Sequence, residues 1–154
     1  MKEIPLTQGK VTIVDEDMFE YLNQWKWHLS GTKYAVRTVN NKKIYMHRLV
    51  AKVPEGMCTD HINRNKLDNQ KSNLRVCTIT ENNRNRDKQH NNLSGLKGVS
   101  WINRPKPWSS RICVNKKIIY LGWFDTKEEA YEAYLKAENK HFGEFARLNQ
   151  VDAQ

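Results

Sequence analysis

The alternation of apolar and polar positions predicts short strands in the first third of the chain. Trp25 and Trp27 lie two positions apart, which is the spacing of side chains on one face of a strand. Residues 33–46 alternate on both sides of Asn40 and Asn41, which predicts a hairpin with its turn at this pair. We therefore expect residues 1–57 to form a small β-rich region, which acts either as a scaffold or as a surface for a ligand.

The middle of the chain predicts two strands followed by a helix. Residues 60–63 are expected to form the first strand, a polar loop follows, and residues 74–77 form the return strand. Thr78 and Glu81 have the spacing of a capping box, so a helix is expected to start there and to run through Arg86. In such a ββα unit, the start of the first strand and the first helical turn can face the same point.

The last third of the chain changes pattern after a polar segment at residues 88–97, which is typical of a linker. Residues 99–102, 108–114 and 117–123 predict three strands. Residues 126–143 begin with a second capping box, carry apolar residues along one helical face and end at a glycine, which predicts an amphipathic helix.

Together these patterns predict an α+β protein in three parts. The expected parts are a β-rich N-terminal region (residues 1–57), a central ββα module (residues 58–92) and a three-stranded antiparallel sheet packed on one helix (residues 93–154). The apolar content of 38% in 154 residues favours several small cores over one large core.

The positive charge is concentrated in one segment. The formal net charge is +9, and residues 84–120 alone contain nine basic residues and one acidic residue. Trp101, Trp108 and Tyr120 are interleaved with these charges. Basic and aromatic residues in one segment suit a nucleic acid, which binds through its phosphates and stacks its bases, better than a uniformly solvated surface.

The cysteines and the apolar runs limit the cellular setting. The three cysteines are never spaced as Cys-x-x-Cys, so neither a disulfide framework nor a four-cysteine zinc site is expected. The N-terminus lacks an apolar signal core, and no apolar run approaches the ~20 residues of a membrane span. We expect a cytoplasmic protein that is not secreted.

The stretch from Asp60 to Asn82 contains the residue types that phosphodiester hydrolysis requires. A neutral imidazole, here His61, can take a proton from water, and the oxygens of Asp60 and Asn82 suit a hard divalent cation such as Mg²⁺ or Mn²⁺. Each residue alone is more often a solvated or turn residue. Adjacent strand residues also point to opposite faces, so Asp60 and His61 can serve one substrate only at a bulge or a strand end.

This stretch resembles the HNH endonuclease family, in the form found in phage and intron-borne homing nucleases. The matching residues are His61, Asn73 twelve positions later and Asn82 nine positions further on, with Asp60 as the accompanying acid. The resemblance implies that His61 is the general base, that Asp60 and Asn82 bind the metal, and that Asn73 ties the loop so that His61 is correctly aimed. Many relatives have a histidine in place of Asn82. We expect the upstream His47 to be structural.

Residues 95–148 resemble the apetala-two/ethylene-response-factor DNA-binding domain, in which a three-stranded sheet lies in the major groove. The matching pieces include Gly98-Val99, the segment from Trp108 to Ile112 and Gly143. Ser100 and Cys113 replace basic residues of the plant domains, so base specificity does not transfer. The resemblance, together with the basic helix end, implies DNA contacts by Arg84, Arg86, Trp101, Arg104, Trp108, Arg111, Lys116, Lys117 and Tyr120.

The resulting expectation is a metal-dependent, homing-type endonuclease that acts on double-stranded DNA as a monomer and grips DNA with its C-terminal sheet. The resemblance implies products with 5′-phosphate and 3′-hydroxyl ends and, for a phage-encoded protein, action in the bacterial host. Two alternatives are a catalytically inactive, sequence-specific DNA-binding regulator and an RNA-binding structural protein. Metal-dependent cleavage of a duplex distinguishes the nuclease from the regulator, and tighter binding to RNA than to DNA would indicate the third.

Overall fold

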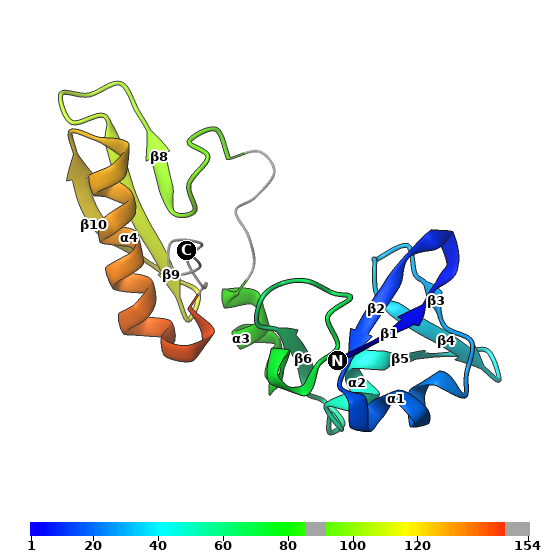
Figure 1. Cartoon of the computed structure of the whole chain (residues 1–154). Helices are drawn as coiled ribbons and strands as arrows, with labels where there is room; N and C mark the ends of the chain where they lie inside the picture. Colours follow the sequence, from blue (N-terminus) through cyan, green and yellow to red (C-terminus); the bar gives the residue numbers. More distant parts are fainter. Residues whose placement is uncertain (86–91, 147–154) are drawn as a thin grey trace. The chain divides into compact units, whose positions relative to one another are not determined.

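The computed structural model describes residues 1–85 and 92–146 and shows an α+β protein with several small antiparallel sheets (Figure 1). The chain divides into two compact units, Met1–Asn83 and Arg84–Gln154. No helix of the described residues is long and apolar enough to cross a membrane.

The first half of unit 1 contains two small sheets and two short helices. Asn40 and Asn41 both have positive φ angles (47° and 59°), as the tight turn of a two-residue hairpin requires, so the predicted hairpin is confirmed. In chain order the elements are β1 (Lys2–Pro5), a 3₁₀ turn (Thr7–Gly9), β2 (Val11–Val14), α1 (Glu16–Asn23), β3 (His28–Leu29), β4 (Ala35–Val39), β5 (Lys42–Tyr45) and α2 (Met46–Val50).

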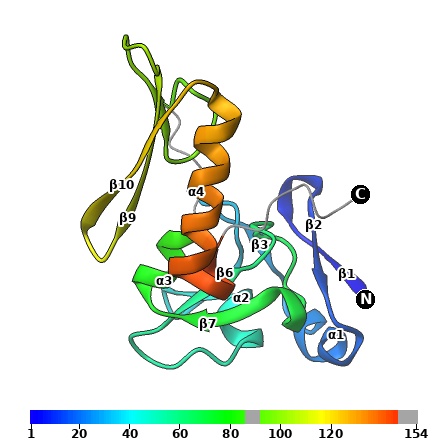
Figure 2. The ribbon, with the colours of Figure 1, turned by 90° about the vertical axis from the view of Figure 1, so that its left-hand side faces the viewer.

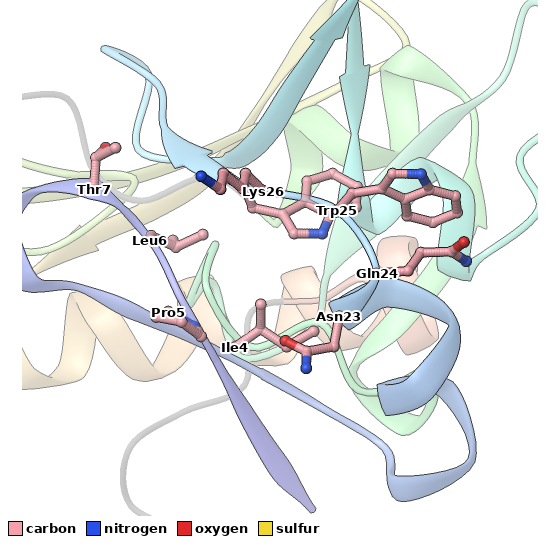
Figure 3. Close-up of a pocket in the computed structure, with 9 residues that line it drawn as sticks. Ile4, Pro5, Leu6, Thr7, Asn23, Gln24, Trp25 and Lys26 are labelled. Atoms are coloured by element: carbon pink, nitrogen blue, oxygen red, sulfur yellow. The ribbon is translucent and has the colours of Figure 1, made fainter.

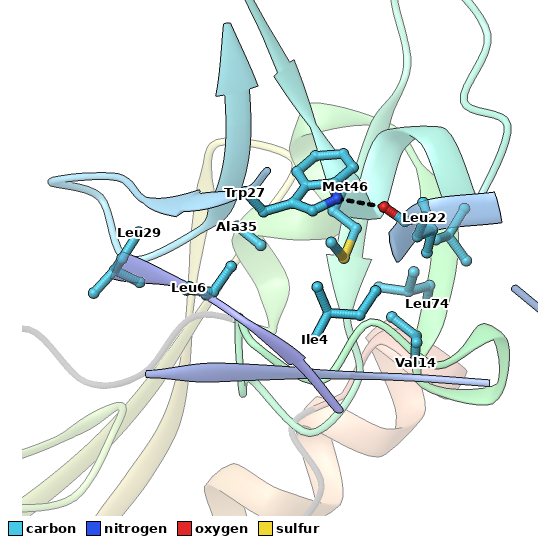
Figure 4. Close-up of a cluster of buried hydrophobic side chains, with 10 residues drawn as sticks. Ile4, Leu6, Val14, Leu22, Trp27, Leu29, Ala35, Met46 and Leu74 are labelled. Carbon is cyan, nitrogen blue, oxygen red and sulfur yellow. Dashed lines mark hydrogen bonds between the residues drawn. The ribbon is translucent and has the colours of Figure 1, made fainter. Parts of the chain in front are cut away.

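The prediction of a strand at Trp25 and Trp27 is wrong. Both tryptophans precede the two-residue strand β3, and the buried Trp27 indole N–H donates to the carbonyl oxygen of Leu22 at 2.8 Å, as Figure 4 shows. The Arg37 guanidinium lies over the Trp25 ring, 3.8 Å from its centroid. The Trp27 side chain therefore bonds to a backbone carbonyl oxygen at the end of α1, and these two tryptophans are not part of a strand. A shallow pocket of about 520 Å³ opens beside it and is lined by residues 4–7 and 23–27 (Figure 3).

The N-terminal region and the central hairpin share one hydrophobic core (Figure 4). Ile4 and Val14 come from the first sheet, Met46 comes from α2, and Leu74 comes from the central hairpin. Burial of apolar side chains is the main favourable term in folding. The N-terminal residues are therefore expected to stabilise the segment that carries the candidate catalytic residues.

The central strands form a hairpin that leads into a short helix. β6 (Cys58–His61) pairs antiparallel with β7 (Leu74–Cys77), after a 3₁₀ turn at Lys71–Asn73, and α3 spans Ile79–Arg84. The first strand thus begins two residues earlier than predicted and ends at His61. The capping box is confirmed, because Glu81 N–H donates to Thr78 Oγ1 at 3.2 Å and Thr78 N–H donates to Glu81 Oε2 at 2.8 Å.

Unit 2 contains a three-stranded antiparallel sheet and one long helix. The strand order is β10 (Lys117–Phe124), β9 (Trp108–Val114), β8 (Val99–Trp101), and α4 (Lys127–Phe142) lies against β9 and β10 (Figure 2). A 3₁₀ turn at Gly143–Phe145 follows. The second capping box, at Thr126, is also confirmed.

A buried polar cluster holds the entry to unit 2. Glu138 is buried on α4, and its Oε1 accepts hydrogen bonds from Tyr134 Oη and Lys97 Nζ, each at 2.9 Å. Lys97 Nζ also donates to the backbone oxygen of Arg84 at 2.7 Å. A buried carboxylate is tolerated only when it is paired and hydrogen-bonded, and this cluster provides both.

Candidate active site

Asp60 and His61 are the last two residues of β6, so they lie at a strand end, one of the two arrangements that we expected could let both serve one substrate. Both side chains are buried, with 4% and 5% of the residue exposed. Across the hairpin, Asp60 pairs with Arg75, and the Arg75 Nε and Nη2 atoms donate to Asp60 Oδ2 at 2.8 and 2.6 Å. Arg75 thus provides the positive partner that a buried carboxylate requires.

Asn73 connects the two ends of the loop between β6 and β7. Its Nδ2 donates to the Asp68 carbonyl oxygen at 2.8 Å, and its Oδ1 accepts from the Asn63 N–H at 2.9 Å. The Asn73 carbonyl oxygen also accepts from the Ile62 N–H at 2.9 Å. These bonds fix the backbone on both sides of the loop and directly after His61.

His61 is held from the loop by Asn69, a residue that the sequence did not single out. The His61 Nε2 and Asn69 Oδ1 atoms are 3.1 Å apart, and Asn69 is 1% exposed. The loop contains several asparagines of similar appearance. Contacts with the N-terminal region, far earlier in the chain, distinguish this one: Asn69 N–H donates to Ile13 O of β2 at 2.8 Å, and Asn69 Nδ2 lies 3.7 Å from Met46 Sδ.

His47 and two tyrosines from the N-terminal region pack around the His61 ring. The His47 and His61 ring centroids are 5.2 Å apart in an edge-on arrangement, and Tyr34 lies 4.8 Å from His47 and 5.9 Å from His61. Tyr45 completes the group at 5.5 Å from His47. The β-rich region therefore contributes side chains that pack around the candidate site. This holds whether the region is a scaffold or a surface for a ligand.

The buried environment favours neutral imidazoles. Burial lowers the pKa of His61, although the Asn69 hydrogen bond and the Asp60 and Asp68 carboxylates oppose this shift. Burial, with smaller contributions from the charges of His61 and Arg48, lowers the pKa of His47 to about 3. Both imidazoles are therefore neutral at neutral pH, which is the state in which a histidine has a lone pair for a proton.

The low pKa of His47 makes stability depend on pH. The unfolded state, with a histidine pKa near 6.5, binds the proton between about pH 6.5 and 3 while the folded state does not, so stability falls as the pH is lowered through this window. The His47→Phe variant lacks this titrating group. When the pH is lowered from 7.5 to 5, we therefore expect its free energy of unfolding to rise by about 2 kcal/mol relative to that of the wild type. Urea unfolding at both pH values measures this difference.

His141→Phe is the matched control, because His141 is exposed on α4. It is expected to leave the pH dependence unchanged. Equal pH dependence of His47→Phe and the wild type would contradict the buried, neutral state of His47.

Asn82 lies in the middle of α3 and is half-buried. Its backbone N–H donates to the Thr78 carbonyl oxygen at 3.0 Å, and within the described residues its side chain has no hydrogen-bond partner. The structure thus brings Asp60, His61 and Asn73 together around the hairpin. It leaves the Asn82 amide available from the helix that follows.

The two expected metal ligands, Asp60 and Asn82, differ from the ligands of a zinc site in their chemistry. Residues 1–85 and 92–146 contain no group of three or more His, Cys, Asp or Glu side chains that could hold a metal ion. Asp60 and Asn82 are hard oxygen donors. Mg²⁺ typically binds through one or two carboxylates and keeps water or phosphate oxygens in its remaining positions, so these two residues suit it better than they suit zinc.

The expected DNA-contacting residues of unit 2 lie on two faces of the sheet. Arg111 and Tyr120 are cross-strand partners on the face turned away from α4, and both are exposed, Tyr120 to 70%. Trp101 and Trp108 pair with each other, and Trp108 has the strand parity of the buried Ile112, on the α4 side. The seven candidates of this sheet therefore do not share one surface.

The remaining candidates are at the sheet end and at the helix. Arg104 lies over the Trp123 ring at 5.1 Å, and Lys116 and Lys117 lie in and directly after the β9–β10 turn. Arg84 ends α3 with its guanidinium 5.0 Å from the Phe142 ring centroid. Arg86 lies outside the described residues.

Comparison with known proteins supports one family. The family model described as HNH endonuclease matches residues 45–84. The "Uncharacterized HNH endonuclease L560" of Acanthamoeba polyphaga mimivirus is 29% identical over 151 residues, which cover 94% of this chain and 78% of the viral protein. "Protein 3.8" of Escherichia phage T7 is 33% identical over 96 residues, which cover 62% of this chain and 78% of the phage protein. No solved structure matches the chain.

Proposed function

The chain belongs to the HNH endonuclease family and is a nuclease, and from this premise we propose that it hydrolyses phosphodiester bonds of double-stranded DNA with His61 as the general base. The observation that carries the proposal is the buried His61 imidazole. It lies beside Asp60 at the end of β6 and is held on Nε2 by Asn69. The homing type is part of the proposal and is supported by the resemblance of the Asp60–Asn82 stretch.

The proposed reaction starts from a water molecule next to the scissile phosphate. His61 takes a proton from this water, and the oxygen attacks phosphorus. The bond to the 3′ oxygen breaks, and this oxygen takes a proton from solvent, which leaves a 5′-phosphate and a 3′-hydroxyl. Asn73 keeps the backbone after His61 in place through its bonds across the loop.

The Asp60 carboxylate and the Asn82 side-chain oxygen are the proposed ligands of a divalent cation. A bound Mg²⁺ or Mn²⁺ supplies positive charge that stabilises the phosphate oxygens and the departing oxygen. Arg75 holds one oxygen of Asp60 and so limits the directions in which the carboxylate can turn.

We expect the protein to nick or linearise supercoiled DNA carrying a cleavable site only when Mg²⁺ or Mn²⁺ is present. EDTA is expected to stop cleavage, because the developing negative charge then has no cation to stabilise it. Gel analysis with each metal and with EDTA measures this. Cleavage that persists in EDTA would contradict the metal dependence, whereas binding without cleavage under all conditions would favour the regulator.

We further propose that the outer face of the unit 2 sheet grips DNA. Arg111 and Tyr120 lie side by side on this face, and Lys116 lies at its turn. Guanidinium and ammonium groups neutralise phosphates, and an exposed aromatic ring adds contact area. The resemblance of residues 95–148 to the plant domains supports the same surface.

Replacing Arg111 and Lys116 together by alanine is expected to weaken DNA binding and to reduce the salt slope by about two, because each lost phosphate contact removes about one unit. Titrations at several salt concentrations measure the slope. Lys136→Ala with Lys140→Ala removes the same charge from α4 and serves as the control. If both double variants change the slope equally, net charge rather than this face determines binding.

A further inference from the structure

We propose that Asn69 is a positioning residue that places the ring proton of His61 on Nε2, and that Thr12 of β2 sets the orientation of the Asn69 amide. With the proton on Nε2, Nδ1 is the nitrogen of His61 that acts as the base. The effect of this placement on rate rests on the proposed function of His61, whereas the position of the proton can be tested without any cleavage.

The backbone of Asn69 is fixed by β2. Ile13 N–H donates to Leu67 O, and Asn69 N–H donates to Ile13 O, both at 2.8 Å. Ile13 and Asp68 form a parallel bridge between these two bonds. The loop segment that carries Asn69 is therefore attached to the N-terminal sheet as a short extra strand.

The Thr12 hydroxyl determines which way the Asn69 amide faces. Thr12 Oγ1 lies 2.8 Å from Leu67 O and 3.9 Å from Met46 Sδ, and both of these atoms can only accept a hydrogen bond. The single hydroxyl proton is therefore donated to one of them. Its oxygen must then accept a bond from Asn69 Nδ2, which lies 2.7 Å away.

The reverse orientation of the amide is disfavoured by two contacts. It would direct the Asn69 carbonyl oxygen toward Thr12 and force the hydroxyl to choose between that oxygen and Leu67 O. It would also replace the amide nitrogen that now lies 3.7 Å from Met46 Sδ by an oxygen, which places two acceptors together. All three side chains are at most 1% exposed, so no bulk water relieves such a mismatch.

The orientation of Asn69 fixes the tautomer of His61. Asn69 Oδ1 faces His61 Nε2 at 3.1 Å and can only accept, so Nε2 carries the proton in the neutral ring. Nδ1 is then the nitrogen with the lone pair. In the opposite tautomer, Nδ1 would carry the proton. The proposed reaction needs Nδ1 to accept a proton from water instead.

The chain of bonds from Leu67 through Thr12 and Asn69 to His61 joins the N-terminal region to the proposed base. Thr12 is more than 45 residues from His61 in sequence. Its expected influence on the His61 ring passes through the Asn69 amide.

The direct test is the ring tautomer of His61 in the wild-type protein without metal or DNA. Nitrogen-15 NMR of the imidazole, assigned by comparison with His61→Ala, distinguishes protonation on Nε2 from protonation on Nδ1. We expect the Nε2–H form as the dominant species at neutral pH. A dominant Nδ1–H form, or an equal mixture, would overturn the inference, even if the protein cleaves DNA.

Variants of Thr12 separate the positioning role from packing. Thr12→Val removes the hydroxyl at almost constant volume and releases the amide, so the Nε2–H form is expected to lose its dominance. Thr12→Ser keeps the hydroxyl and is the matched control, with the wild-type tautomer. A wild-type tautomer in folded Thr12→Val would show that Thr12 does not set the amide.

The consequence for rate is measured with Asn69→Leu under single-turnover conditions at saturating DNA. We expect a loss of about tenfold to a hundredfold in the cleavage rate with DNA affinity unchanged, by analogy with the loss seen when the hydrogen-bond partner of a metal-bound histidine is removed. An unchanged rate, with the tautomer altered, would refute the catalytic consequence. Should His61→Ala cleave normally, the proposed function fails while the tautomer result stands.

Discussion

Replacement of His61 by alanine is expected to lower the rate of DNA cleavage by about 10²- to 10⁴-fold, which is the usual contribution of a general base. The reason is that no other group in the described part of the site combines a basic nitrogen with an unprotonated state beside Asp60. Among the described residues, His47 is the only other histidine that packs beside His61 and its neighbouring tyrosines. Its ring lies edge-on against the His61 ring, and we do not expect it to take over the role of base. Single-turnover cleavage of pre-bound DNA measures the effect.

DNA affinity is expected to stay at the wild-type level in His61→Ala, because His61 is buried and the proposed grip lies in unit 2. His141→Ala removes an exposed imidazole from α4 and should leave both rate and affinity unchanged. Equal cleavage by His61→Ala and the wild type would remove His61 from the role of base. A parallel loss of affinity would instead indicate damage to the fold.

Gly98→Ala is expected to destabilise unit 2 by more than about 3 kcal/mol and to abolish its DNA binding, through overpacking and backbone strain together. Gly98 has a φ angle of 76°, and a methyl group there would overlap the Tyr134 ring and lie 2.8 Å from the Arg111 carbonyl oxygen. Tyr134 cannot move away easily, because its hydroxyl is bonded to the buried Glu138. Thermal unfolding with a probe in unit 2 measures the loss.

Gly143→Ala separates the two causes. Gly143 also has a positive φ angle (52°), but a methyl group there meets no atom within 4 Å. The ψ angle of Gly143 is −125°, a conformation that favours glycine, so the variant should show the backbone strain alone, of about 1–3 kcal/mol. Similar losses for the two variants would contradict the role of close packing between Gly98 and Tyr134.

Elements that depend on local signals could be predicted from the sequence. The two capping boxes, the hairpin turn at Asn40 and Asn41 and the strand at Trp108–Val114 all appear as expected, because each rests on residues that lie close together in the chain. Local chemistry of this kind acts whatever the tertiary structure is.

Features that depend on distant contacts could not be predicted. The strand spacing of Trp25 and Trp27 was misleading, because the Trp25 ring packs under the Arg37 guanidinium of β4 and the Trp27 indole N–H bonds to the end of α1. Asn69 is one of several loop asparagines, and only its bonds to β2 give it a place beside His61. The sequence singled out the candidate catalytic residues by type and spacing, but the groups that surround them come from the N-terminal fold.

The most direct test of the central claim is to map new DNA ends produced from a randomised duplex library by the wild type and by His61→Ala, each with Mg²⁺ and with EDTA. We predict recurrent ends carrying 5′-phosphates for the wild type with Mg²⁺, none above background in either EDTA reaction, and at least about a hundredfold fewer for His61→Ala with Mg²⁺. The same ends produced by His61→Ala at the wild-type level, or wild-type cleavage in EDTA, would contradict a metal-dependent nuclease that uses His61 as its base.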